Sequence, residues 1–163
     1  MNAQLATALL LLLLVPNLTA CDDDPTAAAD DCASGFEFVG DDNAEMEMYP
    51  GEACVECHRN EGEGPIFSIA GTVYETVSER DLCLGLEGTK VVITDANGVE
   101  KTLTSNSSGN FAFEGSIATP YTAKLVDSSG KEMPMVTPQT NGDCNTCHSP
   151  GGTDGAAGRI YVY

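Results

Sequence analysis

The sequence predicts an all-β fold in which a β-sandwich is flanked by two loop-rich segments. Several short runs between residues 66 and 137 alternate apolar with polar side chains, as strands with one buried face do. Turn residues separate these runs at regular spacing, and glycines and prolines repeatedly interrupt the segment before them. Short strands joined by such turns are typical of a sandwich of two sheets.

The expected strands follow one another along this region. Residues 66–76 form an apolar run rich in β-branched side chains, and residues 90–94 form a second strand that ends before Asn97-Gly98. Asn-Gly is the strongest short signal for a hairpin, because both central residues of a type I′ turn need a positive φ. Further strands are expected over residues 99–104, 110–114, 120–127 and 131–137.

Part of this region resembles the carboxypeptidase regulatory-like family. The likeness rests on glycines and alternation in residues 70–73, 89–98, 104–113 and 121–125. It covers residues 66–135 and implies an immunoglobulin- or transthyretin-like β-sandwich that has no catalytic residues of its own. The resemblance thus implies a scaffold.

The candidate cofactor-binding residues lie in the flanking segments. The chain has two histidines, and each closes a Cys-x-x-Cys-His motif. This motif is the attachment signature of c-type haem, in which both cysteines bond to the haem vinyl groups and the histidine becomes the proximal iron ligand. The sequence therefore predicts two covalent haems, held by Cys54 and Cys57 and by Cys144 and Cys147, with His58 and His148 as iron ligands.

Two other chemistries stay open for these cysteines. Four thiolates in two Cys-x-x-Cys pairs suit a tetrahedral zinc site, although the pairs lie far apart in sequence and zinc needs no histidine directly after each pair. The pairs are also able to form disulfides. We favour haem because two complete motifs occur in one chain that has no histidine outside them.

Methionines are the candidates for the second axial position, because no histidine is left for it. Apart from Met1 there are four, with Met46 and Met48 before the first motif and Met133 and Met135 before the second. His/Met ligation raises the reduction potential of a haem. We expect Met48 on the first iron and Met135 on the second, with Met46 and Met133 as alternates and an exchange between haems left open. In the alternative interpretation these methionines fill the core.

The methionine pairs also suit Cu(I), so an exported copper carrier is a second hypothesis. An iron without a sixth ligand would be open to small gases or peroxide. Peroxidase chemistry needs a distal acid–base group, most often histidine, and the chain has none to spare. We therefore expect an electron carrier rather than an enzyme.

The N-terminus resembles the signal peptide of a bacterial lipoprotein. Residues 9–15 form an apolar run too short to cross a bilayer, and Leu18-Thr19-Ala20-Cys21 follows it. We expect cleavage before Cys21, a lipid on its sulfur, and a membrane-anchored protein in the periplasm or at the cell surface, on either the inner or the outer membrane. The usual basic residue near the start is missing, and an ordinary signal peptide followed by a coincidental cysteine is the alternative.

These features divide the chain into five parts. A signal peptide covers residues 1–20, an acidic tether 21–31, a first haem segment 32–65, the sandwich 66–137 and a second haem segment 138–163. Cys32 and Cys83 are the two cysteines left over. In an oxidising compartment we expect a disulfide between them, with two buried free thiols as the alternative.

The net charge of −18 argues against nucleic acid as a partner, because phosphate binding needs lysine and arginine. Residues 22–63 hold 14 acids against a single base, Arg59. Such a surface favours basic redox partner proteins. Arg59 and Arg159, which follow the two motifs, are candidates to pair with haem propionates.

Residues 48–54 and 141–148, followed by Gly158-Arg159-Ile160, are similar to small lipoprotein cytochromes in which c-type haem motifs flank such a sandwich. This resemblance implies the transfer of single electrons between membrane-associated donors and acceptors. The alternative from a different functional class is a binding or adhesion module that carries haems as structural staples.

Overall fold

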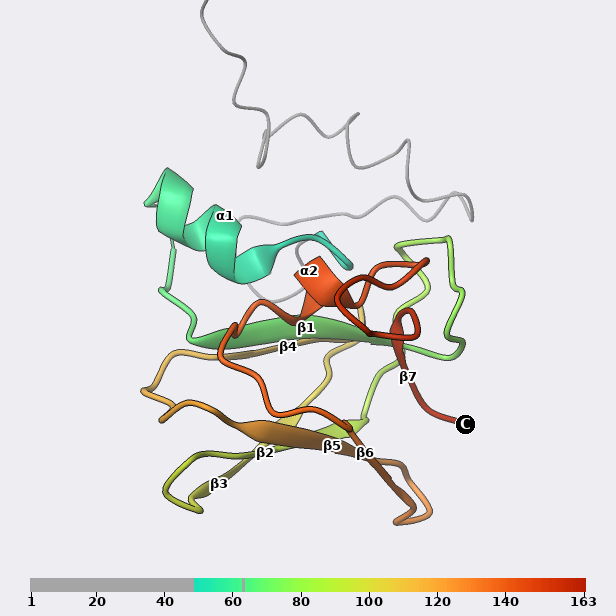
Figure 1. Ribbon diagram of the computed structural model, residues 1–163. Helices are drawn as coiled ribbons and strands as arrows, with labels where there is room; N and C mark the ends of the chain where they lie inside the picture. Colours follow the sequence, from blue (N-terminus) through green and yellow to red (C-terminus); the bar gives the residue numbers. More distant parts are fainter. Residues whose placement is uncertain (1–48, 63) are drawn as a thin grey trace, which may run out of the picture.

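The computed structural model describes residues 49–62 and 64–163, which form seven strands and two short helices (Figure 1). The helices are α1 (Cys54–Glu61) and α2 (Cys144–Cys147). In chain order the strands are β1 (Ile69–Tyr74), β2 (Lys90–Thr94), β3 (Glu100–Thr104), β4 (Asn110–Phe113), β5 (Thr122–Val126), β6 (Glu132–Pro134) and β7 (Ile160–Tyr161).

The strands form two sheets that lie as the layers of a β-sandwich, so the predicted all-β class is confirmed at this level (Figure 1). One sheet has the strand order β4-β1-β7 and the other the order β3-β2-β5-β6. The main core contains side chains from both sheets, among them Val73 of β1, Phe111 of β4 and Ile93 of β2. The apolar side chains that alternate along these strands therefore meet between the layers.

Three loops between strands share one design, an Asp or Asn followed three positions later by glycine. They begin at Asp95, Asn106 and Asp127. In each loop the side-chain oxygen accepts hydrogen bonds of 2.8–3.0 Å from the backbone amides two and four residues ahead. The glycine takes the left-handed conformation, with φ between 77° and 85°. The carbonyl oxygen of the same Asp or Asn accepts from the glycine amide at 2.9–3.0 Å, so the side chain adds to the backbone hydrogen bond of the turn.

The turn at Asn97-Gly98 therefore differs from the expected type I′ turn. Only Gly98 has a positive φ, of 77°, whereas a type I′ turn requires it at both central positions. The pairing of β2 with β3 leaves a loop of residues 95–99, which is longer than the two-residue loop of a type I′ hairpin. Asp95 decides this geometry, because its carboxylate satisfies two amides within the loop.

Strand β1 is completely buried, since all six of its residues are buried. It is the middle strand of its sheet. Ile69 and Val73 belong to the core between the sheets, whereas Ala70 packs with Val55 of α1 and with Phe67. Both helices lie over this sheet, on the side away from the four-stranded sheet (Figure 1).

The sandwich also uses a strand from the C-terminal segment, which the sequence pattern did not indicate. Ile160 and Tyr161 of β7 pair in parallel with Val73 and Tyr74 of β1. A strand of two residues is too short to show an alternation period. Within the described residues, six strands fall inside the predicted sandwich and the seventh lies beyond it.

Gly71 of β1 allows the second motif to pack directly on the strand. A Cβ atom at this position would lie 2.8 Å from Cβ of Cys144 and 2.9 Å from Cζ of Phe111. We expect Gly71→Ala to lower the free energy of unfolding by about 1–3 kcal/mol, the usual cost of overpacking, as measured by urea denaturation. Gly151→Ala is the control, because nothing lies within 4 Å of its added atom. An equal loss in both variants would contradict this account.

Candidate functional site

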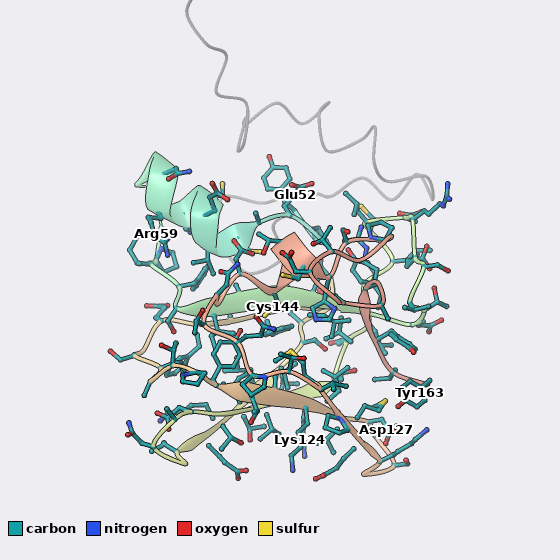
Figure 2. All side chains as sticks on the ribbon, in the orientation of Figure 1. Glu52, Arg59, Lys124, Asp127, Cys144 and Tyr163 are labelled. Atoms are coloured by element: carbon teal, nitrogen blue, oxygen red, sulfur yellow. The ribbon has the colours of Figure 1, made fainter. Side chains whose placement is uncertain are left out.

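The structure brings the two Cys-x-x-Cys-His motifs together, although they lie far apart in the sequence. The first lies wholly within α1, and the second consists of α2 with His148 directly after it. Both helices pack on β1 (Figure 1). Figure 2 shows Glu52 and Cys144 in the region where the helices meet, with Arg59 farther along α1 and Lys124 on the opposite sheet. The two motifs therefore form one site.

Helix α1 has eight residues, about two turns, and contains the whole first motif. It ends at Gly62, whose φ of 67° is the left-handed conformation common after a helix. Glu56 lies in its first turn and Arg59 in its last, which matches the helix dipole. Val55 packs with Ala70 and so determines which side of the helix faces β1.

Helix α2 interrupts a stretch of chain that runs beside β1. Before the helix, Asp143 forms a parallel bridge with Ala70, and after it β7 joins the same strand. The helix is a single turn, closed by a hydrogen bond from the amide of His148 to the carbonyl oxygen of Cys144 at 2.9 Å. Backbone pairing with β1 on both sides therefore fixes the position of the second motif.

Asp143 connects the second motif to the first. It precedes α2, yet its Oδ2 accepts a hydrogen bond from the backbone amide of Glu56 in α1, at 2.9 Å. That amide is one of the donors left free at the start of a helix, so Asp143 caps α1 from a distant part of the chain. The carboxyl group is buried, and burial raises its pKa.

Asn145 makes a second connection between the motifs. Its Nδ2 donates to the carbonyl oxygen of Glu52 at 2.8 Å and lies 4.0 Å from Sγ of Cys54. The same side chain accepts from the amide of Thr72 through Oδ1 at 3.0 Å and donates to the Thr72 hydroxyl at 3.1 Å. A residue inside the second motif therefore links the entrance of the first motif to β1.

Thr72 is the centre of this hydrogen-bonded array. Its hydroxyl accepts from the amide of Gly51 at 2.8 Å and from Asn145, and it donates to Oδ1 of Asn110 at 2.7 Å. A hydroxyl has one donor and two acceptor sites, so all of them are used. Thr72, Asn110 and Asn145 are buried, and water cannot replace these partners.

His148 is oriented as a metal ligand would be. Its Nδ1 lies 2.8 Å from the carbonyl oxygen of Gly158. A carbonyl oxygen only accepts, so Nδ1 carries a proton, and the tautomer that this hydrogen bond selects has its lone pair at Nε2. Metal-binding histidines commonly have this arrangement, in which a backbone carbonyl fixes the tautomer and the ring orientation.

His58 packs tightly against the chain that follows α1. Its ring centroid lies 4.6 Å from that of Phe67, and a Cβ atom at Gly64 would approach its Nδ1 to 3.1 Å. Within the described residues, two buried side-chain polar atoms have no hydrogen-bond partner, Nδ1 of His58 and Oδ1 of Asp143. Such atoms are rare in native proteins and call for an explanation, and both belong to this site.

The motif cysteines are in two chemical states. Cys54, Cys144 and Cys147 are free thiols, whereas Cys57 is disulfide-bonded. Burial, with the carboxylate of Asp143 as the second cause, raises the pKa of Cys54 and of Cys144 to about 12. Both thiols are therefore protonated at neutral pH. Cys57 cannot form a thioether while its sulfur is part of a disulfide.

Cys83, the other cysteine expected to form a disulfide, is disulfide-bonded. Its expected partner, Cys32, lies outside the described residues, so that pairing stays a prediction. The lipid on Cys21 and the proposed ligands Met46 and Met48 also fall outside the described residues.

The second methionine pair lies in and beside the sandwich core. Met133 is buried in the main core, and its sulfur accepts a hydrogen bond from the amide of Tyr163 at 3.5 Å. Met135 is partly buried against the same core. The position of Met133 agrees with a role as core filler, and Met135 is the more exposed of the two.

The two arginines considered for propionate pairing differ in environment. Arg59 is exposed on α1. Arg159 is buried, with its guanidinium 4.8 Å from the ring centroid of Tyr74 and its Nε donating to the carbonyl oxygen of Glu79 at 3.3 Å. Its backbone follows Gly158, so the buried cation and the residue that orients the second motif's histidine are neighbours in one loop.

No known protein family, curated protein or solved structure matches the chain. In the part of the chain that the structure describes, no helix is long and apolar enough to cross a membrane. In that same part, no three His, Cys, Asp or Glu side chains form a group able to hold a metal ion. The function therefore has to be inferred from the residues of the site.

Sequence reasoning identified the cysteines and histidines of this site but not the polar residues that hold them together. Asp143 and Asn145 lie directly before and within the second motif, at positions that the motif leaves unspecified. Thr72 lies in an apolar run. A polar residue within an apolar run is the sequence signal that could have identified Thr72, because a buried hydroxyl needs hydrogen-bond partners.

We expect Thr72→Val to weaken the attachment of both motifs to β1. Valine keeps the shape of the side chain but leaves the amide of Gly51, Nδ2 of Asn145 and Oδ1 of Asn110 short of a partner, and each such buried group costs about 1–3 kcal/mol. A lower urea midpoint checks this prediction. Thr102→Val, at an exposed position of β3, is the matched control, and a similar fall there would refute the role given to Thr72.

Proposed function

We propose that this chain is a dihaem c-type cytochrome that transfers electrons from a position anchored at a membrane. The observation that carries the proposal is the convergence on β1 of two Cys-x-x-Cys-His motifs, which together contain every histidine of the chain.

The site contains the residue types that two covalently attached haems need, with one of the four attachment cysteines, Cys57, in a disulfide. When bound, haem iron supplies one-electron chemistry, while the protein supplies axial ligands, position and the exclusion of water. The hydrogen bond between Nδ1 of His148 and Gly158 leaves Nε2 free to bind iron. The proposed attachment residues are Cys54 and Cys57 for the first haem and Cys144 and Cys147 for the second, with His58 and His148 as proximal ligands.

The disulfide at Cys57 sets a condition on this proposal. Thioether formation consumes a cysteine thiol, so Cys57 has to be reduced before the first haem is attached. The other three motif cysteines are already thiols. Attachment to the second motif therefore needs no prior reduction.

A methionine sulfur is the proposed sixth ligand of at least one iron. We propose Met48 for the first haem, with Met46 as the alternate, and Met135 for the second. Met133 is the weaker alternate, because it is buried in the main core.

The charge of the chain suits a carrier with basic partners. With a net charge of −18, it would attract a basic redox protein at low ionic strength, and added salt would slow their association. A lipid on Cys21 of the exported chain would keep the site near membrane-bound donors and acceptors. The sandwich, proposed to be of the carboxypeptidase regulatory-like type, would serve as the scaffold.

A second candidate is a β-sandwich binding or adhesion module, either with haems as structural staples or with motif cysteines that form structural disulfides instead. The disulfide at Cys57 favours this candidate. The same disulfide works against a zinc site made of both Cys-x-x-Cys pairs, because it removes one of four thiolates. A Cu(I) carrier would depend on the methionines rather than on the motifs.

Expression in a host that attaches c-type haem tests the main proposal. We expect two haems per chain that resist extraction and show the reduced and oxidised absorption bands of a c-type cytochrome. The double variant Cys144→Ala/Cys147→Ala should retain one haem, whereas Cys83→Ala, outside both motifs, should retain two. Protein that carries no haem and keeps Cys57 in its disulfide would support the binding or adhesion module instead.

Replacing the proposed sixth ligands tests the axial assignment. We expect Met48→Ala and Met135→Ala each to lower the reduction potential of one haem, because a thioether ligand raises it, while both haems stay attached. Spectroelectrochemical titration measures the potentials. Val136→Ala, at an exposed position beside Met135, is the control, because it leaves every methionine in place. Unchanged potentials in both alanine variants would reject the ligand assignment but not the cytochrome.

A further inference from the structure

We infer that Asp143 and Asn145 are positioning residues that hold the two proposed haems in one fixed mutual arrangement, so that the haems act as a coupled pair. This inference rests on the proposed function. It goes beyond it, because a chain with two attachment motifs at opposite ends of a sandwich segment could equally carry two independent haems.

The first argument is that each motif is hydrogen-bonded to a residue that directly precedes the other motif or lies two positions before it. Oδ2 of Asp143 accepts from the amide of Glu56, a spacer residue of the first motif, at 2.9 Å. Nδ2 of Asn145, a spacer residue of the second motif, donates to the carbonyl oxygen of Glu52 at 2.8 Å and lies 4.0 Å from Sγ of Cys54. An attachment sulfur of one motif is thus in contact range of the other motif.

The second argument is that these contacts are shielded from water. Asp143 and Asn145 are 4% and 5% exposed. Hydrogen bonds in such surroundings are stronger than in water and leave their donors and acceptors no alternative partner. Asn145 is itself fixed by two hydrogen bonds to Thr72 of β1, so the link between the motifs is tied to the most buried strand.

The third argument concerns the apolar packing of α1, which gives the helix little directional constraint. Its buried apolar contact with the sandwich is a small cluster of Val55, Phe67 and Ala70, with Cys54 and Ala112 packed against it. Apolar packing is non-directional. The hydrogen bonds of Asp143 and Asn145 therefore add direction at the start of α1, beside the covalent constraint of the disulfide at Cys57.

Variants at the two positions test the link between the motifs. Asn145→Asp retains an oxygen for the amide of Thr72 but loses the donor to Glu52 and to the Thr72 hydroxyl. Asp143→Ala removes the cap on Glu56, whereas Asp143→Asn keeps an oxygen there and should rescue. Asn97→Asp, in the exposed loop after β2, controls for the change in net charge and not for the burial of a charge.

The experiment records circular dichroism in the Soret region of the haem-loaded protein, together with hydrogen exchange of the Glu56 amide. We expect the wild type to give the two-signed Soret signal of interacting haems. Asn145→Asp and Asp143→Ala should lose most of it with both haems still attached, and Asp143→Ala should also lose protection of the Glu56 amide. Asp143→Asn and Asn97→Asp should keep both signals.

The outcomes distinguish this inference from the function on which it rests. A wild-type protein with two attached haems and no two-signed signal would overturn the coupling but leave the cytochrome intact. Full retention of the signal in Asn145→Asp and Asp143→Ala would likewise overturn the positioning role. Absence of haem from the wild type would reject the proposed function itself. Loss of Glu56 protection without loss of the Soret signal would show that Asp143 is only a helix cap.

Discussion

The hydrogen bonds around Thr72 are the constraint on which the arrangement of this molecule depends. A buried hydroxyl in the middle strand of a sheet has to be satisfied from within the protein. Its partners come from the turn before α1, from β4 and from α2, through Gly51, Asn110 and Asn145. Segments that are distant in sequence are thereby fixed at one point, and neither motif can move without leaving a polar group unpaired.

The sandwich and the site depend on each other. The second motif lies between two stretches that pair with β1, at Asp143 and at β7, so the sheet is completed only when that motif is in place. Conversely, Gly71 leaves room for Cys144 against the strand. Backbone pairing with β1 places the second motif beside that strand. The absence of a side chain at Gly71 determines how closely the motif packs on it.

The chemistry of the site follows from small differences between two motifs of identical pattern. His148 has a backbone carbonyl that fixes its tautomer, whereas Nδ1 of His58 is buried without a partner. Cys57 is oxidised, whereas both cysteines of the second motif are thiols. The surroundings of each motif, rather than its residue pattern, determine the histidine tautomer and the oxidation state of the cysteines. If the proposed function holds, these surroundings make the second motif the better prepared of the two for haem attachment.

The sequence by itself determined the β class and most strand positions, because alternation is a local property. It also named the cysteines and histidines of two motifs as candidates, because motif spacing is local too. It missed β7, whose two residues have no period, and it misjudged the loop of residues 95–99, where an Asp95 side chain overrides the Asn-Gly signal. Only the tertiary structure decided that the motifs meet, that Met133 fills the core and that Asp143 and Asn145 join the motifs. These features depend on long-range partners for buried polar groups, which no local pattern specifies.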